Sequence, residues 1–303
     1  MIHYCLRCIL PDSRPGTTLD GRGVCSACRG HEDKDGQIDW QGRGAALRRL
    51  ADDVKALGRD YDCIVPVSGG KDSWYQVIAC QELGLKVLAV TWRTPARTQV
   101  GQENLDSLIM RLGVDHIDYT INPDVERRFM KAAFEIKGAT AIPMHMALFA
   151  IPIRLAVQLG VPLVVWGENP QLEFGGQDEE RLATDLDPAW VRRHGVSNQT
   201  VIEDWIGKGG LSASDLAAYR LPPDEAFHCG TRSIFLGSYM RWNSFENAAV
   251  AGRHGFVSYA ADLRTGLWEF ADIDCGFISL HHFLKWHKFG LTRAFDNLSV
   301  QIR

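Results

Sequence analysis

Short apolar runs alternate with longer stretches of helical periodicity through most of the chain. Between the apolar runs, apolar residues recur every three or four positions, which predicts helices over 74–83, 104–112, 125–136 and 147–159. The alternation predicts an α/β fold, a parallel five-stranded sheet with helices on both faces. The five predicted strands cover residues 62–67, 86–92, 116–121, 162–166 and 233–237.

The changes in this pattern along the chain suggest a division into separate parts. Residues 1–35 have almost no apolar period and are rich in Gly, Pro, Ser and Thr, so they predict a small separate module. Residues 36–60 carry a helical pattern and predict a linker helix. Residues 61–303 would form the main domain, and the irregular stretch 171–229 within it predicts an insertion that shapes a substrate site.

Four cysteines can explain how the first module holds together. Cys5, Cys8, Cys25 and Cys28 form two Cys-x-x-Cys pairs, the spacing that offers four thiolates to a tetrahedral Zn²⁺. Zinc binding would supply the folding energy that the missing apolar core cannot. The pattern therefore predicts a zinc ribbon with a structural Zn²⁺, and a pair of redox dithiols is the alternative.

Composition says more about the partners and cellular location of the protein than about its chemistry. The 303 residues are 46% hydrophobic and 23% charged, enough for one large core and a smaller module. The net charge of −4, without a basic block, argues against nucleic acid as the obligatory partner. No run approaches the roughly 20 apolar residues of a membrane span, and the first residues lack the pattern of a signal peptide. We therefore expect a cytoplasmic protein with no membrane span.

A glycine-rich corner carries the clearest chemistry. It reads Ser68-Gly69-Gly70-Lys71-Asp72-Ser73, directly between the first predicted strand and a helix. Glycines let backbone N–H groups turn toward an anion, the helix N-terminus adds partial positive charge, and the hydroxyls and lysine add donors. The corner therefore predicts a polyphosphate site. Its spacing matches neither a Walker A loop nor a dinucleotide fingerprint.

This corner resembles the PP-loop of the ATP pyrophosphatases, which implies ATP binding, transfer of AMP to an oxygen of the substrate and release of pyrophosphate. Further stretches narrow the resemblance. They are the double Cys-x-x-Cys ribbon, Gly-Gln-Glu-Asn at 101–104, Trp-Gly-Glu-Asn-Pro at 166–170, Glu-Phe-Gly-Gly at 173–176, Phe-Leu-Gly-Ser-Tyr at 235–239, and the tail from Gly276-Phe-Ile to Gly-Leu-Thr-Arg293. Together they resemble the N-acetyl sugar amidotransferases of bacterial surface-polysaccharide (LPS O-antigen) biosynthesis. Relatives of that family typically continue beyond Thr-Arg-Ala at 292–294 into a further helical stretch.

The resemblance implies a reaction on a nucleotide-activated N-acetyl sugar, such as a UDP-diacetamido uronic acid. ATP would convert an acetamido oxygen into an O-adenylyl imidate, and ammonia would displace AMP to give an acetamidino group. No cysteine outside the ribbon has the setting of a glutaminase nucleophile. We therefore expect ammonia from a separate glutaminase subunit, with a channel-forming cyclase-like subunit as a possible companion.

The predicted strand ends suggest roles for single residues. Residues 68–73 would hold the triphosphate, the backbone near Thr91 would meet adenine, and Gly167 would allow close approach of the ribose or α-phosphate. Lys71, Asp72, Glu168 and Glu173 are the expected catalytic residues: Lys71 stabilises the leaving pyrophosphate, Asp72 and Glu168 carry Mg²⁺, and Glu173 positions ammonia or takes its proton. Solvated loop charge is the alternative for both glutamates. Substrate-binding residues are expected at Asn104, Asn169, Arg232 and Arg241, although the arginines could equally be solvated.

Two other functions remain open on this evidence. A tRNA-thiolating enzyme also joins a PP-loop to cysteine knuckles, but it calls for further cysteines in the catalytic domain and for basic surface. No Cys-x-x-Cys lies beyond residue 28. A non-catalytic subunit that keeps ATP binding is the third possibility, and the intact Gly-Gly-Lys-Asp-Ser run speaks against it.

Overall fold

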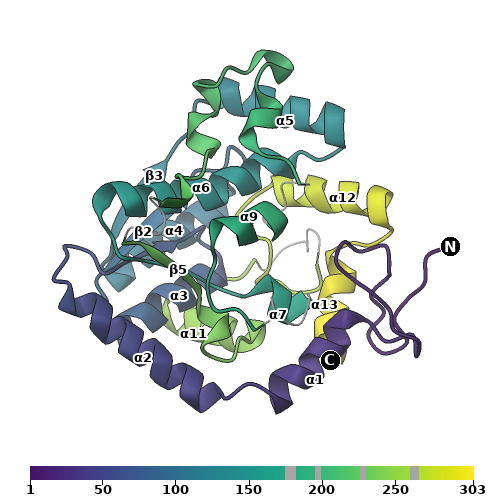
Figure 1. The fold of residues 1–303 in the computed structure, drawn as a ribbon, viewed down its shortest axis with the longest axis horizontal. Helices are drawn as coiled ribbons and strands as arrows, with labels where there is room; N and C mark the ends of the chain where they lie inside the picture. The colour runs from purple at the N-terminus through teal and green to yellow at the C-terminus, as the bar shows by residue number, and fades with distance from the viewer. Residues whose placement is uncertain (175–181, 195–198, 226–229, 260–265) are drawn as a thin grey trace.

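A parallel five-stranded sheet forms the centre of the molecule (Figure 1). The structure is a computed structural model and describes residues 1–174, 182–194, 199–225, 230–259 and 266–303. All four strand pairings are parallel, and the strand order is β3-β2-β1-β4-β5. The strands are β1 (Cys63–Pro66), β2 (Val87–Trp92), β3 (Asp115–Tyr119), β4 (Leu163–Trp166) and β5 (Arg232–Phe235).

The strand order places a topological switch point between β1 and β4. From β1 the chain proceeds outward through β2 and β3, and then returns to add β4 and β5 on the other side of β1. Loops after the two strands at such a point diverge and leave a crevice at the carboxyl edge of the sheet, where open α/β folds bind ligands. The segments that follow β1 and β4 are the glycine corner and residues 167–169.

Helices cover both faces of the sheet because successive strand side chains point to opposite sides. In β1, Cys63 and Val65 pack on one face and Ile64 packs on the other. This arrangement confirms the predicted fold class. The first face carries α2 (Trp40–Ala56), α3 (Lys71–Glu82), α4 (Gln99–Leu112) and α11 (Ser244–His254). The second face carries α5 (Pro123–Lys137), α6 (Ala141–Leu159), α9 (Pro188–His194) and the 3₁₀ turns η1 (Ile202–Trp205) and η3 (Asp215–Tyr219), and the 3₁₀ turn η2 (Lys208–Gly210) contacts α5.

Several helices begin earlier than the apolar period predicts. Helix α3 starts at Lys71 rather than at 74, because the chain turns into the helix directly after Gly70. Helix α4 starts at Gln99 rather than at 104, because the Thr98 side chain accepts a hydrogen bond from the Gly101 N–H and caps the helix. Apolar spacing detects the buried middle of a helix, whereas a cap can extend its polar first turn.

The cysteine-rich segment packs against the C-terminal helices rather than standing apart. Helix α1 (Ser26–Gly36) follows the cysteines, and α12 (Phe277–Phe289) and α13 (Arg293–Ile302) lie beside this segment in Figure 1. The Ser299 hydroxyl donates to the Cys8 carbonyl at 2.6 Å. Arg14 forms an ion pair with Asp296 at 3.2 Å. Both ends of the chain therefore meet in one structural unit.

The stretch predicted as an insertion contributes to the core over much of its described length. Residues 184–186 run antiparallel to β5, and Leu186, Trp205 and Leu216 are buried on the second face of the sheet. Among the described residues of this stretch, only those of its first helix, α7 (Pro170–Phe174), reach the cavity described below. Residues 175–176 of the Glu-Phe-Gly-Gly stretch, and Cys229, lie outside the described residues.

One helix corrects the expectation that no segment could cross a membrane. By length and composition alone α6 could do so, and half of its most apolar window is buried inside the protein. Its buried side chains, among them Ile142, Ile151 and Ile153, pack against the second face of the sheet. The contacts of α6 are those of a core helix.

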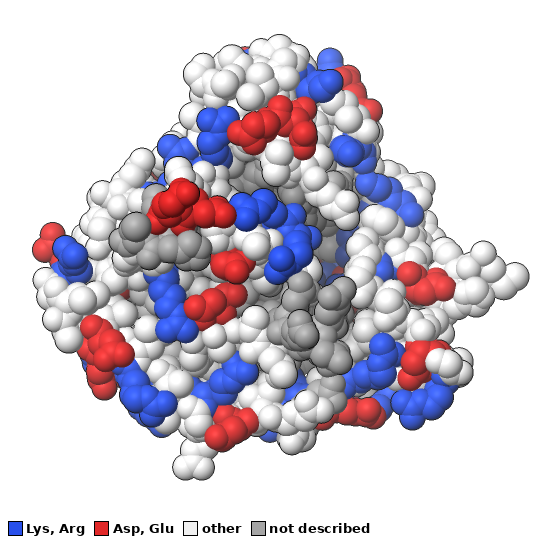
Figure 2. Space-filling view, in the orientation of Figure 1, with Lys and Arg blue, Asp and Glu red and all other residues white. Residues whose placement is uncertain are grey.

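Over the face of the molecule in Figure 2, acidic and basic side chains are interspersed.

Candidate functional site

The glycine corner forms a tight loop at the carboxyl end of β1. The Ser68 N–H donates to the Ser73 hydroxyl at 2.9 Å, which closes the loop across its base. Helix α3 begins at the next residue after Gly70, and no side chain caps its N-terminus. The partial positive charge of the helix is therefore presented at the loop, the arrangement that binds phosphate groups.

Gly69 has a conformation and a setting that only glycine fits. Its φ is +92°, in the region that side chains rarely adopt. A Cβ atom there would lie 2.4 Å from the Gly101 carbonyl oxygen of α4. The loop is thus shaped by close packing against α4 as well as by its own turn.

A cavity of about 390 Å³ opens beside the loop and brings together all four predicted catalytic residues. Its size lies in the range typical of small-molecule sites. Lys71 and Asp72 come from the start of α3 after β1, whereas Glu168 and Glu173 come from the segment after β4. The two groups therefore meet across the switch point. The cavity is also lined by Trp242, Phe245, Trp268, Arg293, Asp296 and Asn297, and by His31 and Lys34 of α1.

Lys71 and Asp72 are engaged with each other in this structure. The Lys71 Nζ donates to Asp72 Oδ2 at 2.6 Å, and the ammonium lies 5.6 Å from the centroid of the Phe270 ring. Asn247 of α11 donates to the other carboxylate oxygen at 3.3 Å. The lysine is buried, so its charge is held at the mouth of the phosphate loop in a desolvated setting.

Glu168 is the carboxyl group whose proton affinity is most changed in the cavity. Burial, together with the nearby Asp72 carboxylate, raises the pKa of Glu168 to about 7 even though the Arg293 guanidinium opposes the rise. Removal from water is thus the main reason that the charged form of Glu168 is disfavoured. Such a carboxyl group can either exchange a proton near neutral pH or accept a cation.

Glu173 has a different environment because it faces the cysteine-rich segment. Its Oε1 accepts a hydrogen bond from the Lys34 ammonium at 2.5 Å, and the two side chains form an ion pair. Lys34 comes from α1, 139 residues earlier in the chain. The sequence shows no motif that would have linked these two residues.

A further acidic group lies at the loop and was not predicted. Burial raises the pKa of Asp274, and a hydrogen bond from the Ser68 hydroxyl partly offsets the rise. The Asp274 backbone packs against Gly101 so closely that a Cβ there would lie 2.6 Å from the Asp274 Cα. The loop is therefore enclosed by a segment about 200 residues away in sequence, directly before the Gly276 tail that carries part of the resemblance.

Thr91 and Gly167 lie at strand ends, but their nearest space is filled by the protein itself. The Thr91 hydroxyl donates to the Val67 carbonyl at 2.8 Å and contacts His116 at 2.9 Å. A Cβ on Gly167 would lie 2.5 Å from the Gln76 side-chain amide and 3.0 Å from Trp242. In this structure Gly167 is required by packing between β4 and its neighbours.

Asn104 and Asn169, both predicted to bind substrate, are buried and hydrogen-bonded to the protein. Asn104 binds both the N–H and the carbonyl of Val257, at 2.9 and 3.0 Å. The Asn169 amide donates to Ala183 and Ser238 at 3.1 Å each, and its oxygen accepts from the Gln171 N–H. The structure gives both residues the role of fixing neighbouring loops.

Arg232 and Arg241 are not brought to the cavity. Arg232 is the first residue of β5, at the amino end of the strands, and makes two hydrogen bonds to the Asp185 carboxylate at 2.8 and 2.9 Å. Arg241 stacks on the Trp40 ring at 5.3 Å. Sequence proximity to the fifth strand led to this expectation, and the direction of the strand removes Arg232 from the site.

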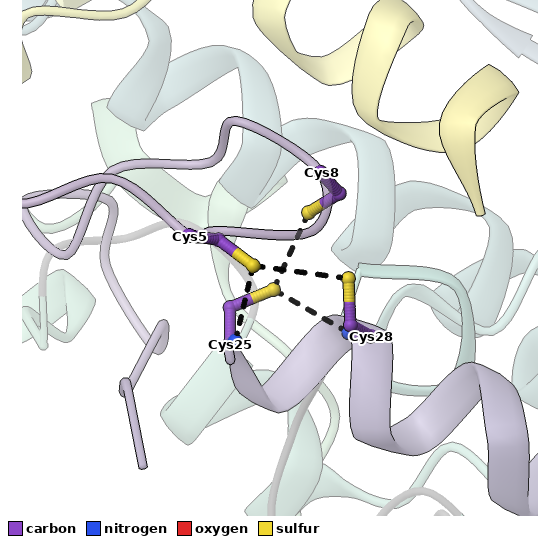
Figure 3. Close-up of side chains that lie close together, drawn as sticks. All are labelled: Cys5, Cys8, Cys25 and Cys28. Atoms are coloured by element: carbon purple, nitrogen blue, oxygen red, sulfur yellow. Dashed lines mark hydrogen bonds between the residues drawn. The ribbon is translucent and has the colours of Figure 1, made fainter. Parts of the chain in front are cut away.

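The four N-terminal cysteines converge on one point (Figure 3). Their sulfur atoms all lie within 4.8 Å of one another, with Cys8 and Cys25 3.4 Å apart and Cys5 and Cys28 3.9 Å apart. Four sulfurs bound to one zinc ion at about 2.3 Å lie roughly 3.8 Å from each other. The geometry of the cluster fits Zn²⁺.

The surroundings of the sulfurs also fit a metal site. Backbone N–H groups of Arg7, Cys25 and Cys28 donate to Cys5 or Cys25 sulfur atoms at 3.2 to 3.4 Å, which stabilises thiolate charge. Without a cation, the hydrogen bond with Cys8 and burial raise the pKa of Cys25 to about 12, and burial raises that of Cys28 to about 12. A bound cation reverses this effect because it stabilises the thiolates.

Among the cavity residues that sequence reasoning missed, Arg293 and Asp296 come from the C-terminal helix α13. Arg293 forms an ion pair with Asp272 at 3.0 Å. Asp296 binds both Arg14 and Lys285, at 3.2 and 3.0 Å. Arg293 belongs to the Gly-Leu-Thr-Arg stretch that carried part of the resemblance, so that stretch was the available signal.

Comparisons with known proteins find neighbours in structure, among them two synthetases. No family model matches the chain, and no curated relative matches it. An NH3-dependent NAD synthetase from Campylobacter jejuni has a TM-score of 0.33 and 20% identity, and the match covers 48% of this chain and 65% of that one. An NMN synthetase from Francisella tularensis has a TM-score of 0.33 and 17% identity, with 72% and 95% covered. Matches this distant carry no weight for function, and the fold class rests on the sheet itself.

Proposed function

We propose that the protein is an ATP-dependent amidotransferase that forms AMP and pyrophosphate and acts on an acetamido group of a nucleotide-activated N-acetyl sugar. The observation that carries this proposal is the meeting of Lys71, Asp72, Glu168 and Glu173 in one cavity beside the phosphate loop. The loop supports binding of a triphosphate, and the carboxylates support handling of a nitrogen nucleophile. The choice of sugar rests on the resemblance of the sequence motifs.

The reaction follows from the chemistry of an amide. Its oxygen is a poor leaving group, so it first attacks the α-phosphorus of ATP; the new O–P bond forms as the bond to pyrophosphate breaks. Lys71 and the N-terminus of α3 stabilise charge on the departing pyrophosphate. Ammonia then adds to the carbon, the C–O bond to AMP breaks, and loss of a proton from nitrogen gives the amidine.

The carboxyl groups divide between two tasks in this scheme. Asp72 and Glu168 offer hard oxygen ligands at the loop, and they would hold Mg²⁺, which neutralises charge on the phosphates when bound. Glu173 would accept N–H hydrogen bonds from ammonia. A structural Zn²⁺ on the four cysteines would hold the ribbon together.

The source of the ammonia and the cellular location of the reaction complete the proposal. We expect the ammonia to come from a separate glutaminase subunit, since no cysteine of the main domain has the sequence setting of a glutaminase nucleophile. We place the reaction in the cytoplasm, where thiols such as those of the ribbon stay reduced.

A direct assay tests the proposal. The protein is incubated with ATP, Mg²⁺, ammonium and a panel of nucleotide-linked mono- and diacetamido sugars, and the products are analysed by mass spectrometry. Replacement of O by NH lowers the sugar mass by about one unit, with AMP and pyrophosphate formed in equal amounts. Formation of ADP, or an unchanged mass for every sugar, would contradict the proposed function.

A further inference from the structure

We propose that the cysteine ribbon is part of the active site and that Lys34, carried on its helix, is a positioning residue for Glu173. The ribbon here means residues 1–36, from the N-terminus to the end of α1. The role of Glu173 toward ammonia rests on the proposed function, whereas the placement of Lys34 rests on contacts within the chain.

The cysteine cluster and Lys34 belong to the same helix. Helix α1 begins at Ser26, between Cys25 and Cys28, so two of the four thiols lie at its start. Lys34 follows Cys28 by six residues, about 9 Å along the helix. His31 and Lys34 are three residues apart, lie on the same side of α1, and both line the cavity. Whatever fixes the thiols therefore fixes the direction in which Lys34 points.

Lys34 is committed to its partner in the cavity. The residue is 7% exposed, and lysine is rarely buried to this degree unless it is paired. Its ammonium lies 2.5 Å from Glu173 Oε1, and the Glu173 side chain is itself only 15% exposed. The Trp40 indole N–H donates to the Lys34 carbonyl at 3.2 Å and holds the end of the helix. Removing one member of such a pair leaves the other charge uncompensated.

Two other cations of the cavity have different partners. Lys71 pairs with Asp72, and Arg293 pairs with Asp272. Lys34 forms the ion pair with Glu173, within a cavity that also holds the carboxyl groups of Asp72 and Glu168. With Lys34 in place, the Glu173 carboxylate is held in one direction by the hydrogen bond from the ammonium. Without Lys34, Glu173 loses both that hydrogen bond and its paired charge, so its carboxylate is no longer positioned toward ammonia.

The contacts of the ribbon with α13 support the same conclusion. Ser299 of α13 donates to the Cys8 carbonyl, and Arg14 of the ribbon pairs with Asp296 of α13, which lines the cavity. Arg14 also lies 5.4 Å above the ring of Phe174, next to Glu173. The ribbon therefore touches the cavity wall from two sides, through α1 and through α13.

Lysine acylation tests the placement without any enzyme assay. The full-length protein is treated with an acetylating reagent, and modification of each lysine is followed by peptide mass spectrometry. We expect Lys34 to react at least tenfold more slowly than Lys131, whose side chain is 69% exposed, and to approach Lys131 after a chelator removes the metal. Equal rates in the untreated protein, or a Lys34 that stays protected once the metal is gone, would overturn the coupling.

Kinetics test the positioning role. Lys34→Met is expected to raise the KM for ammonium at least tenfold while the Kd for ATP and the zinc content stay within twofold; Lys34→Arg, which keeps the charge, should recover most of the loss. Lys131→Met is the matched control and should behave as the unmodified protein. An unchanged ammonium KM in Lys34→Met would overturn the role. If the wild-type protein turns over no sugar, the proposed function and the Glu173 role fall together, while the acylation result decides the placement of Lys34 alone.

Discussion

Two walls of the cavity are built in different ways. The first, from the segments after β1 and β4, consists of residues close in sequence to a strand end: Lys71 and Asp72 on one side and Glu168 on the other. The second consists of α1 and α13, whose residues lie more than 250 positions apart and meet through contacts such as Ser299 with Cys8. One wall follows from local chain geometry, and the other from long-range packing.

This difference explains which wall holds the reactive phosphates and which meets the second substrate in our proposal. Backbone N–H groups at a strand-to-helix corner are fixed by the fold and recognise a phosphate chain that is the same in every ATP-using enzyme. Side chains brought by a separate ribbon can vary without disturbing the sheet. Selectivity for the nitrogen donor and the sugar would therefore lie with the second wall.

Loss of a ribbon thiol should have the largest effect on the second wall. Cys8→Ser is expected to abolish tight zinc binding and to unfold residues 1–36 locally, because structural zinc contributes binding free energies of about 10–16 kcal/mol in small zinc modules. Metal analysis and hydrogen exchange of the ribbon measure the two effects. Cys80→Ser is the control, since Cys80 is buried on α3 outside the cluster. One zinc per chain in Cys8→Ser would contradict the four-thiolate site.

Loss of the loop lysine should have the largest effect on the first wall. Lys71→Ala removes the buried cation beside Asp72, and we expect kcat for pyrophosphate release to fall about 10²- to 10³-fold, as when one preorganised donor to a developing anion is lost. Zinc content should not change. Lys131→Ala serves as the control for removal of a lysine. A rate within fivefold of the wild type would show that the loop does not hold the triphosphate.

The two walls also differ in how far the sequence predicted them. The five strands, the phosphate corner and the cysteine cluster were predicted because each is a local pattern with a physical requirement, such as glycine at Gly69. Lys34 and Asp296 could not be predicted, since their roles depend on partners 139 and 282 residues away, Glu173 and Arg14. Asn104 shows a different limit, because the sequence motif does not reveal that its amide is hydrogen-bonded to the Val257 backbone.

A smaller effect is expected from substitution of Gly69, the glycine that shapes the phosphate loop in the first wall. Gly69→Ala adds a Cβ 2.4 Å from the Gly101 carbonyl oxygen at a positive φ, and we expect a loss of at least about 2 kcal/mol of unfolding free energy together with weaker ATP binding. Gly58→Ala is the matched control: its φ is +62°, but nothing lies within 4 Å of the added atom. It should cost only about 1 kcal/mol. Urea denaturation measures both, and equal losses would show that packing against α4 does not constrain the loop.

The smallest effect should come from the arginine at the far end of the strands. Arg232 pairs with Asp185 at the amino end of β5, and both side chains are nearly half exposed. Arg232→Met should therefore cost at most about 1 kcal/mol of unfolding free energy. The KM for the sugar should stay within twofold, whereas Arg293→Met, which alters the cavity itself, should raise it. A large rise in sugar KM for Arg232→Met would mean that the substrate extends around the edge of the sheet, and the assignment of specificity to the ribbon and α13 would then be wrong.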